Sequence, residues 1–185
     1  DYLDIMAAVD EMSARPYVDT AFIGITGYSY GGFMSSWIIG HDTRFKAAVV
    51  GAPCINLSSM YGTSDIGVRF GEVNWGGMRQ DALDKFLEHS PLTYASNVET
   101  PVLLMHGEDD ARCPIEQSEQ YFVALKRLGK EVEFVRFPGS AHSLLRSGHP
   151  RLREEYLSRM LGWFESYLDV AKRAAKVADT APADN

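Results

Sequence analysis

Residues 27–32 read GYSYGG, a glycine-rich turn between an apolar run at 22–26 and an apolar helical stretch, FMSSWII. A G-x-S-x-G pattern between a strand and a helix is typical of a nucleophilic serine held on a sharp turn. Such a serine has strained backbone dihedrals, so the residues two before and two after it, Gly27 and Gly31, are expected to be small to avoid a collision. We therefore predict that Ser29 is a nucleophile, with a purely structural glycine turn as the alternative.

Short apolar runs recur along the chain, at residues 47–50, 101–105 and 132–137. Between and around them, apolar residues at helical spacing predict a first helix that stops near Pro16, a helix capped by Gly129 and a last helix. The apolar stripes of these three helices consist of Tyr2, Ile5, Met6, Val9 and Met12; Tyr121, Phe122, Leu125 and Leu128; and Leu157, Leu161, Phe164 and Leu168. Apolar strands that alternate with helices indicate an α/β fold, with a mostly parallel sheet flanked by helices on both faces.

The first apolar run, at 22–26, has only a helix before it. A wholly apolar strand is expected in the middle of a sheet, because an edge strand would expose a row of unpaired backbone groups. We therefore expect further strands of the same sheet upstream of residue 1. We divide the chain itself into a folded domain at 1–170 and an alanine-rich tail at 171–185, whose end is expected to fray.

Charge and hydropathy argue against several classes of protein. The 185 residues carry 18 Lys and Arg against 25 Asp and Glu, a net charge of −7 without basic clusters, which argues against a nucleic-acid partner. No apolar run approaches the roughly 20 residues that cross a membrane, and the N-terminus carries acids where a secretory signal has bases. Cys54 and Cys113 provide neither a disulfide framework nor zinc spacing, so we expect a cytoplasmic protein without a metal or cofactor.

A serine hydroxyl is a weak nucleophile at neutral pH, so it needs a histidine base and an acid that orients this base. In hydrolases with this turn the chain order is Ser, then Asp or Glu, then His. Loops at the carboxyl ends of two predicted strands offer both groups: three acids at 108–110 and, after the final strand, His142. Composition leaves the choice among Glu108, Asp109 and Asp110 open, with a solvated acidic turn as the alternative. The other histidines are expected at the surface (His41, His89, His149) or positioning a loop (His106).

Several segments of the sequence resemble the catalytic domain of the prolyl oligopeptidase family of serine peptidases, especially its acylaminoacyl-peptidase branch. They are GYSYGG, RFKAAV at 44–49, YGTSD at 61–65, SPLTYASNVETPVLLMHGEDDARCPIEQSE from 90 and FPGSAHSLLRSGHP from 137, and together they cover nearly the whole chain except the tail. The resemblance implies Ser29 as the nucleophile, Asp110 as the acid at the end of an H-G-x-x-D word, and His142 as the base. It also implies an alpha/beta-hydrolase domain whose first strands, second oxyanion donor and N-terminal β-propeller lie outside this chain.

The activity implied is that of a serine peptidase that hydrolyses short peptides or N-acylated peptides through an acyl-enzyme. The backbone N–H of Tyr30, at the start of the helix that follows Ser29, is the natural first oxyanion donor. A carboxylesterase-type hydrolase is one alternative, and an inactive fragment that lacks part of the oxyanion hole is another. Assembly into a homo-oligomer is left open.

Four further residues are candidates for substrate binding. The segment at 61–78 contains Tyr61, Phe70 and Trp75 and either lines the substrate pocket or forms a loop folded over a helix. Arg112 either steers a substrate carboxylate or pairs with a neighbouring acid, and we favour the pair. Cys113 is expected to be a small buried apolar side chain.

Overall fold

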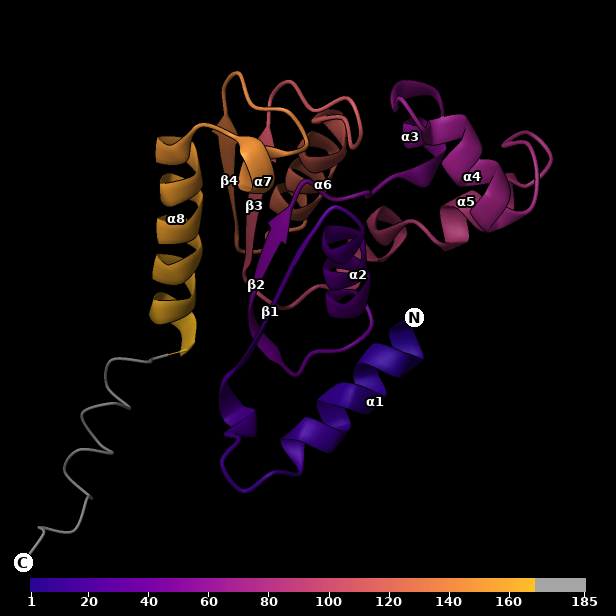
Figure 1. The fold of residues 1–185 in the computed structure, drawn as a ribbon. Helices are drawn as coiled ribbons and strands as arrows, with labels where there is room; N and C mark the ends of the chain where they lie inside the picture. Colours follow the sequence, from indigo (N-terminus) through magenta and orange to yellow (C-terminus); the bar gives the residue numbers. More distant parts are fainter. Residues whose placement is uncertain (169–185) are drawn as a thin grey trace, which may run out of the picture.

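The computed structural model describes residues 1–168, and the expected tail at 171–185 lies outside them. Helices and strands follow one another in the order expected of an α/β fold (Figure 1). The strands are β1 (Ile23–Tyr28), β2 (Phe45–Gly51), β3 (Val102–Gly107) and β4 (Val132–Phe137). The helices are α1 (Tyr2–Ser13), α2 (Tyr30–Ile39), α3 (Leu57–Thr63), α4 (Gly67–Trp75), α5 (Leu83–Glu88), α6 (Glu116–Arg127), α7 (Leu144–Ser147) and α8 (Pro150–Leu168), with 3₁₀ helices η1 (Thr20–Phe22) and η2 (Pro91–Asn97).

The four strands form one sheet in the order β1-β2-β3-β4, and all three pairings are parallel. Each observed strand overlaps a predicted apolar run and extends beyond it by no more than two residues at either end. Parallel pairing places all the carboxyl ends at one edge of the sheet, where the loops after β1, β3 and β4 meet. The predicted parallel sheet flanked by helices is confirmed.

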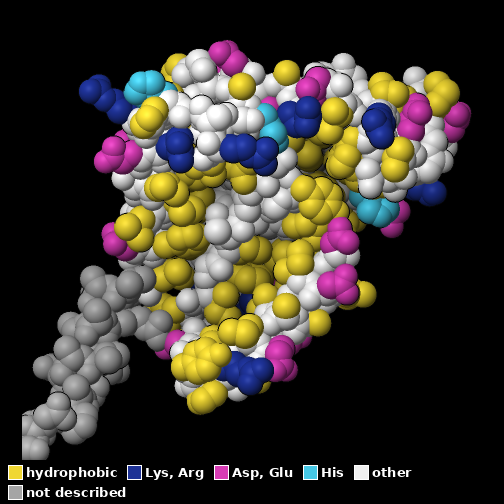
Figure 2. All heavy atoms as spheres, viewed as in Figure 1, with side chains coloured by type: hydrophobic (Ala, Val, Ile, Leu, Met, Phe, Trp, Pro, Cys, Tyr) yellow, Lys and Arg dark blue, Asp and Glu magenta, His cyan; other side chains and the backbone are white. Residues whose placement is uncertain are grey.

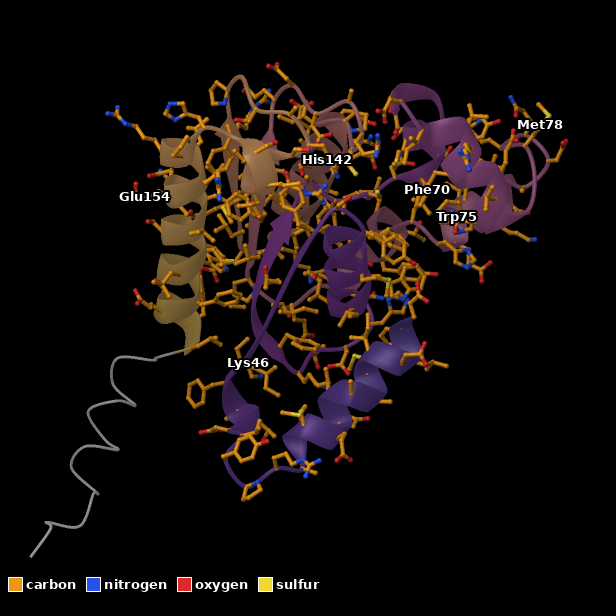
Figure 3. The ribbon with its side chains drawn as sticks, in the orientation of Figure 1. Lys46, Phe70, Trp75, Met78, His142 and Glu154 are labelled. Carbon is orange, nitrogen blue, oxygen red and sulfur yellow. The ribbon has the colours of Figure 1, made fainter. Side chains whose placement is uncertain are left out.

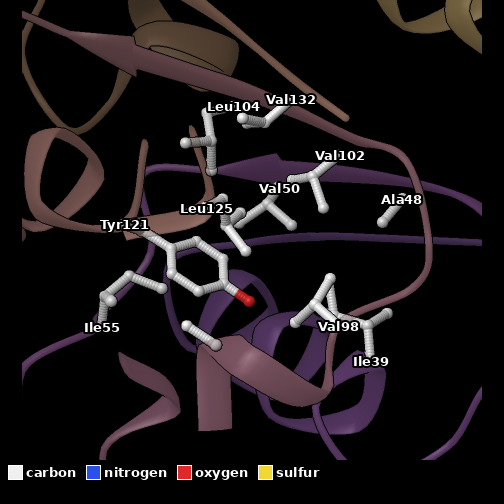
Figure 4. Packing of buried hydrophobic residues seen from close by; sticks show 11 residues of the cluster. Ile39, Ala48, Val50, Ile55, Val98, Val102, Leu104, Tyr121, Leu125 and Val132 are labelled. Carbon is white, nitrogen blue, oxygen red and sulfur yellow. The ribbon is translucent and has the colours of Figure 1, made fainter. Parts of the chain in front are cut away.

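Successive side chains of a strand point to opposite faces of the sheet, so the strands contribute to one apolar core on each face. Ala48 and Val50 of β2 face α2 and α6, in a cluster that also contains Leu104, Tyr121 and Leu125 (Figure 4). The intervening residues of β2, which are Ala47 and Val49, face α8 on the other side of the sheet. Figure 1 shows α8 on one side of the strands and α2 on the other. Because both faces are covered, β3 is buried along its whole length and β2 at all positions but Lys46, whereas β4 carries exposed Glu133 and Arg136.

The predicted apolar stripe of the last helix is partly wrong. Leu157 and Leu161 are 50% and 58% exposed, and the buried face of α8 is provided by Tyr156 and Trp163 instead. Both sets of residues recur at helical spacing, so periodicity alone does not distinguish them. The larger aromatic side chains bury more apolar area against the sheet, which leaves the leucines on the outer face.

Residues 57–88 form a lobe of three short helices, α3, α4 and α5, which we call the α3–α5 lobe. Of the two alternatives for 61–78, the loop folded over a helix is wrong, because most of the segment is helical. Its glycines allow close packing of helices: a Cβ added to Gly67 would lie 2.2 Å from the carbonyl oxygen of Met60, and one added to Gly71 would lie 2.8 Å from the ring of Phe86. Glycine lowers helix propensity, and this obscured the helical pattern in the sequence.

One edge of β1 has no strand partner among residues 1–168, because β1 pairs with β2 alone. Its apolar residues Ile23 and Ile25 are only half-buried. Figure 2 shows hydrophobic side chains gathered on this side of the molecule, between α8 and α1. This free edge of β1 agrees with our expectation of further strands upstream, which stays a prediction. In the described part of the chain, no helix combines the length and hydropathy needed to cross a bilayer.

Candidate active site

Ser29 stands at the carboxyl end of β1 and is the N-cap residue of α2, with φ of 60° and ψ of −119°. A positive φ is uncommon for a residue with a Cβ, and it stores strain at the turn. The turn is fixed by hydrogen bonds on both sides: the Ser29 N–H donates to Gly51 O at 2.9 Å, and the Phe33 N–H donates to Ser29 O at 2.9 Å. The backbone therefore has the strained strand-to-helix turn that the sequence pattern predicted.

The glycines of the turn differ in how much space they have. A Cβ added to Gly27 would lie 2.1 Å from the carbonyl oxygen of Gly31, and one added to Gly32 would lie 2.5 Å from the carbonyl oxygen of Gly51. A Cβ added to Gly31 would meet no atom of the described chain within 4 Å. The expectation that Gly31 must be small to avoid a collision is therefore wrong here, because the crowding arises at Gly27 and at the contact of Gly32 with β2.

These contacts predict effects of different size for alanine at the three glycines of the turn. Gly27→Ala and Gly32→Ala are each expected to lower the free energy of unfolding by about 2 kcal/mol, because backbone atoms must move apart to admit the methyl group. Gly31→Ala is the matched control, and it is expected to change the free energy by no more than about 0.5–1 kcal/mol. Urea unfolding measures all three, and equal losses at Gly27 and Gly31 would contradict this account.

Three side chains from different loops lie in contact at the carboxyl edge of the sheet, where Figure 3 labels His142. The Nε2 atom of His142 lies 2.8 Å from Ser29 Oγ, and its Nδ1 atom lies 2.7 Å from Asp110 Oδ2. An ionised carboxylate only accepts hydrogen bonds, so Nδ1 donates to Asp110. In the neutral ring, Nε2 is then free to accept the proton of the Ser29 hydroxyl. The structure thus brings together the predicted Ser29, Asp110 and His142.

Asp110 is buried, and each of its carboxylate oxygens is held by hydrogen-bond donors. The backbone N–H groups of Arg112 and Cys113 donate to Oδ1 at 2.9 and 3.0 Å, while His142 donates to Oδ2. Burial acts to raise the pKa of Asp110, but the hydrogen bonds from His106 and His142, together with the charge of His142, outweigh it and hold the pKa well below its usual range. The neighbouring Glu108 pairs with Arg136, and Asp109 is exposed.

His106 lies beneath the acid and is fully buried. Its Nε2 atom is 2.7 Å from Cys113 O and 3.3 Å from Asp110 Oδ2, and its Nδ1 atom is 2.8 Å from Ser118 Oγ. A carbonyl oxygen only accepts, so Nε2 donates and Nδ1 accepts from the Ser118 hydroxyl. His106 thus positions the acid loop, as expected. The contribution of Ser118 was not predicted, because no sequence pattern connects an α6 serine to a histidine at the end of β3.

Tyr30 begins α2, so its backbone N–H is the first of the helix and has no acceptor within it. The amides at this helix start and the positive end of the helix dipole favour a negatively charged oxygen next to Ser29. The Tyr30 side chain is directed elsewhere, because its hydroxyl donates to the Asp1 carboxylate. Within the described chain, no group of three or more His, Cys, Asp or Glu side chains is arranged to hold a metal ion.

The substrate-binding candidates lie in or beside the α3–α5 lobe, where Figure 3 labels Phe70 and Trp75. Trp75 is buried and packs edge-on against Phe70 and at a tilt against Phe86, with ring centroids 5.2 and 5.6 Å apart. The Tyr61 hydroxyl donates to Glu72 at 2.9 Å. These contacts give all three aromatic candidates a packing role in the lobe.

Arg112 makes the ion pair that we favoured, since its Nε and Nη2 atoms lie 2.7 and 3.2 Å from the two carboxylate oxygens of Asp65. Two further hydrogen bonds join the same loops: Asp65 N–H to Ala111 O at 2.9 Å and Ser64 Oγ to Arg112 O at 2.6 Å. The α3–α5 lobe is therefore attached directly to the loop that carries Asp110.

Comparisons with known proteins agree on one relationship. The family model described as prolyl oligopeptidase family matches residues 1–171. A Bacillus subtilis (strain 168) protein named uncharacterized peptidase YuxL is 50% identical over 169 residues, which are 91% of this chain and 26% of that protein. The human acylamino-acid-releasing enzyme is 33% identical over 153 residues, 78% of this chain and 21% of that enzyme.

The solved structures include an acylaminoacyl peptidase of Pyrococcus horikoshii, which superposes with a TM-score of 0.87 at 35% identity. That alignment covers 92% of this chain and 28% of the archaeal one. The chain spans about a quarter of the length of the curated relatives it matches.

Proposed function

The chain belongs to the prolyl oligopeptidase family, and from this premise we propose that it carries the nucleophile, base and acid of a serine peptidase. The observation that carries the proposal is the continuous contact from Ser29 through His142 to Asp110, at 2.8 and 2.7 Å. A strained turn under the nucleophile and a buried, ionised acid behind the base add to it. These are the features that activate a serine hydroxyl at neutral pH.

The proposed reaction is acyl transfer in two steps. His142 Nε2 takes the hydroxyl proton while Ser29 Oγ bonds to the substrate carbonyl carbon, and Asp110 stabilises the imidazolium through Nδ1. The imidazolium then gives this proton to the leaving amine as the scissile C–N bond breaks, which leaves an acyl-enzyme on Ser29. Water, deprotonated by the same histidine, attacks the ester and releases the acid.

We assign the first oxyanion contact to the Tyr30 N–H. This group sits one residue after the nucleophile, at a helix start, and is therefore fixed before the substrate arrives. A preorganised donor of this kind contributes about 10²–10³-fold to the rate. A second donor, supplied by residues upstream of this chain, completes the proposed oxyanion hole.

The proposed substrates are short peptides or N-acylated peptides. The names of the relatives support this class, since one is an acylamino-acid-releasing enzyme and another a structurally known acylaminoacyl peptidase. Arg112 lies close to Asp110 at the carboxyl edge and remains a candidate for a polar contact with substrate when its pair with Asp65 opens. The aromatic side chains of Tyr61, Phe70 and Trp75 are proposed to shape the pocket by supporting its wall.

Turnover of two substrates by the full-length protein tests the proposal. We expect cleavage of N-acetyl-aminoacyl p-nitroanilides, abolished by a fluorophosphonate that labels Ser29. An amide needs protonation of its amine leaving group, which His142 is placed to supply, whereas a p-nitrophenyl ester does not. Cleavage of aliphatic p-nitrophenyl esters without any anilide cleavage would favour a carboxylesterase, and lack of labelling at Ser29 would reject the assigned nucleophile.

We further propose that 1–170 is the C-terminal part of the hydrolase domain and that upstream strands of the same protein cover the free edge of β1. The half-buried apolar residues of β1 and the greater length of the relatives support this. An N-terminal β-propeller is the corresponding proposal for the remaining length. A structure of the full-length protein in which this edge of β1 stayed unpaired would contradict the covering strands.

A further inference from the structure

Two cysteines lie in contact beside the candidate active site, although they are 59 positions apart in the sequence. Cys54 follows the carboxyl end of β2, and Cys113 lies in the loop that follows β3. Because β2 and β3 are parallel neighbours, their following loops emerge side by side. The Sγ atoms of the two cysteines lie 3.5 Å apart, within hydrogen-bonding distance, and either thiol can be the donor.

Both thiols are enclosed in the apolar core that joins α2 to the α3–α5 lobe. Cys54 is 3% exposed and Cys113 is 1% exposed, and their neighbours in this core include Phe33, Met60 and Trp75. The hydrogen bond with Cys113 and burial raise the pKa of the Cys54 thiol well above its ordinary value. Cys54 is therefore a protonated thiol in the reduced protein, and both thiols are shielded from solvent.

We infer that Cys54 and Cys113 are a site of reversible disulfide formation, which joins the connection after β2 to the loop that carries Asp110. A disulfide has an S–S distance of about 2.05 Å, so the Sγ atoms must approach by roughly 1.5 Å. The proposal requires that rotation of the two cysteine side chains, together with small movements of their loops, closes this gap. The oxidant class is a low-molecular-weight disulfide, with oxidised glutathione as the probe.

The exchange balances in two steps. One cysteine thiolate attacks oxidised glutathione, forming a mixed disulfide and releasing one glutathione thiolate, which takes up the cysteine's proton. The second cysteine thiolate then attacks the protein sulfur of the mixed disulfide and releases the second glutathione. The protein loses two electrons and two protons, and the glutathione disulfide gains them. Because both thiols are buried, the exchange takes place only while the loop is locally open, and it is therefore slow. Burial does not change the final equilibrium between the thiols and the disulfide, which depends only on the two end states.

The cross-link acts on the backbone that holds the acid. The N–H of Cys113 donates to Asp110 Oδ1 at 3.0 Å, and its carbonyl oxygen accepts from His106 Nε2 at 2.7 Å. Fixing Cys113 to Cys54 therefore anchors both contacts to the end of β2. Closing a covalent loop of this size also reduces the conformational freedom of the unfolded chain.

The test uses the full-length protein, equilibrated in buffers of fixed reduced-to-oxidised glutathione ratio until the composition is constant. Differential alkylation and peptide mapping are expected to show one cross-link joining the two cysteines, with a mass loss of about 2 Da that dithiothreitol reverses. The thermal transition of the hydrolase domain is expected to rise by about 5 °C or more in the cross-linked form. Cys54→Ala and Cys113→Ala are matched controls, and in the oxidised buffer neither should show the cross-link or the rise.

Two results would overturn the inference: both thiols still free to be alkylated after equilibration in fully oxidised glutathione, or a cross-linked protein whose thermal transition is unchanged or lowered. The cross-link and the thermal transition are measured without any substrate. A negative result for either therefore does not contradict the proposed peptidase activity. Equally, both measurements can be interpreted if the protein shows no peptidase activity.

Discussion

Ser29→Ala is expected to lower kcat for anilide cleavage by the full-length protein on the order of 10⁶-fold, to the level that binding and oxyanion contacts sustain alone. The variant loses the atom that we propose forms the acyl bond, and neither His142 nor Asp110 can take over this role. The Cβ and the strained backbone are retained, so the thermal transition is expected to stay close to that of the unaltered protein. Steady-state kinetics measure the loss.

The control is Ser158→Ala, which removes a hydroxyl from the exposed face of α8. It is expected to have the activity of the unaltered protein. A Ser29→Ala protein that retains more than about 1% of the original kcat, without contamination, would mean that another group is the nucleophile.

The strands could be predicted from the sequence because buried parallel strands are short, continuous apolar runs bounded by turn residues. The run at 101–105 and the observed β3, Val102–Gly107, show how closely the ends agree. The sequence predicted less well which face of each helix is buried. On α8 two stripes satisfy the same period, and only packing against the sheet decides that Trp163 is inside and Leu157 outside.

The convergence of Ser29 and His142 followed from topology, because both lie in loops at the carboxyl ends of parallel strands. Residue chemistry alone did not choose among the three acids at 108–110, and the choice of Asp110 depended on the family resemblance. The physical difference between them is visible only in three dimensions: Asp110 faces inward onto His106 and His142, whereas Glu108 pairs with Arg136 at the surface.

Sequence patterns did not predict the contacts that lie outside Ser29, Asp110 and His142. The hydrogen bond of Ser118 to His106 and the approach of Cys54 to Cys113 depend on how α6 and the loop after β2 pack against the acid loop. Neither pair has a characteristic spacing. Such contacts depend on tertiary packing, so they can be identified only from the three-dimensional structure.

Asp110→Asn is expected to lower kcat about 10⁴-fold while leaving the fold intact. The asparagine amide donates a hydrogen bond to Nδ1 of His142 and so favours the ring tautomer with its proton on Nε2. Nε2 then cannot accept the proton of Ser29, although the three side chains stay in contact. Kinetics of the full-length variant measure the loss, and because substrate contacts are unchanged the effect is expected in kcat rather than in KM.

The same substitution is expected to change how stability depends on pH. The pKa of Asp110 is lower in the folded protein than its unfolded value of about 3.9, so the carboxylate stabilises the fold above that pH. This contribution, about 1.5–3 kcal/mol for hydrogen bonds to a charged group, is lost as the pH falls from about 4 toward the folded value. The difference in unfolding free energy between the two proteins should therefore be largest near neutral pH and shrink below about pH 4.

Asp109→Asn separates this effect from a general loss of negative charge in the loop. Asp109 is adjacent in sequence, carries the same charge and is exposed, so its amide variant is expected to keep kcat within about a factor of two and to show the original pH dependence of stability. If both variants lost activity equally, or if Asp110→Asn lost less than about tenfold, the carboxylate would not be fixing the tautomer of His142. The contact at 2.7 Å would then be a structural hydrogen bond, and the base would have to be oriented by another group.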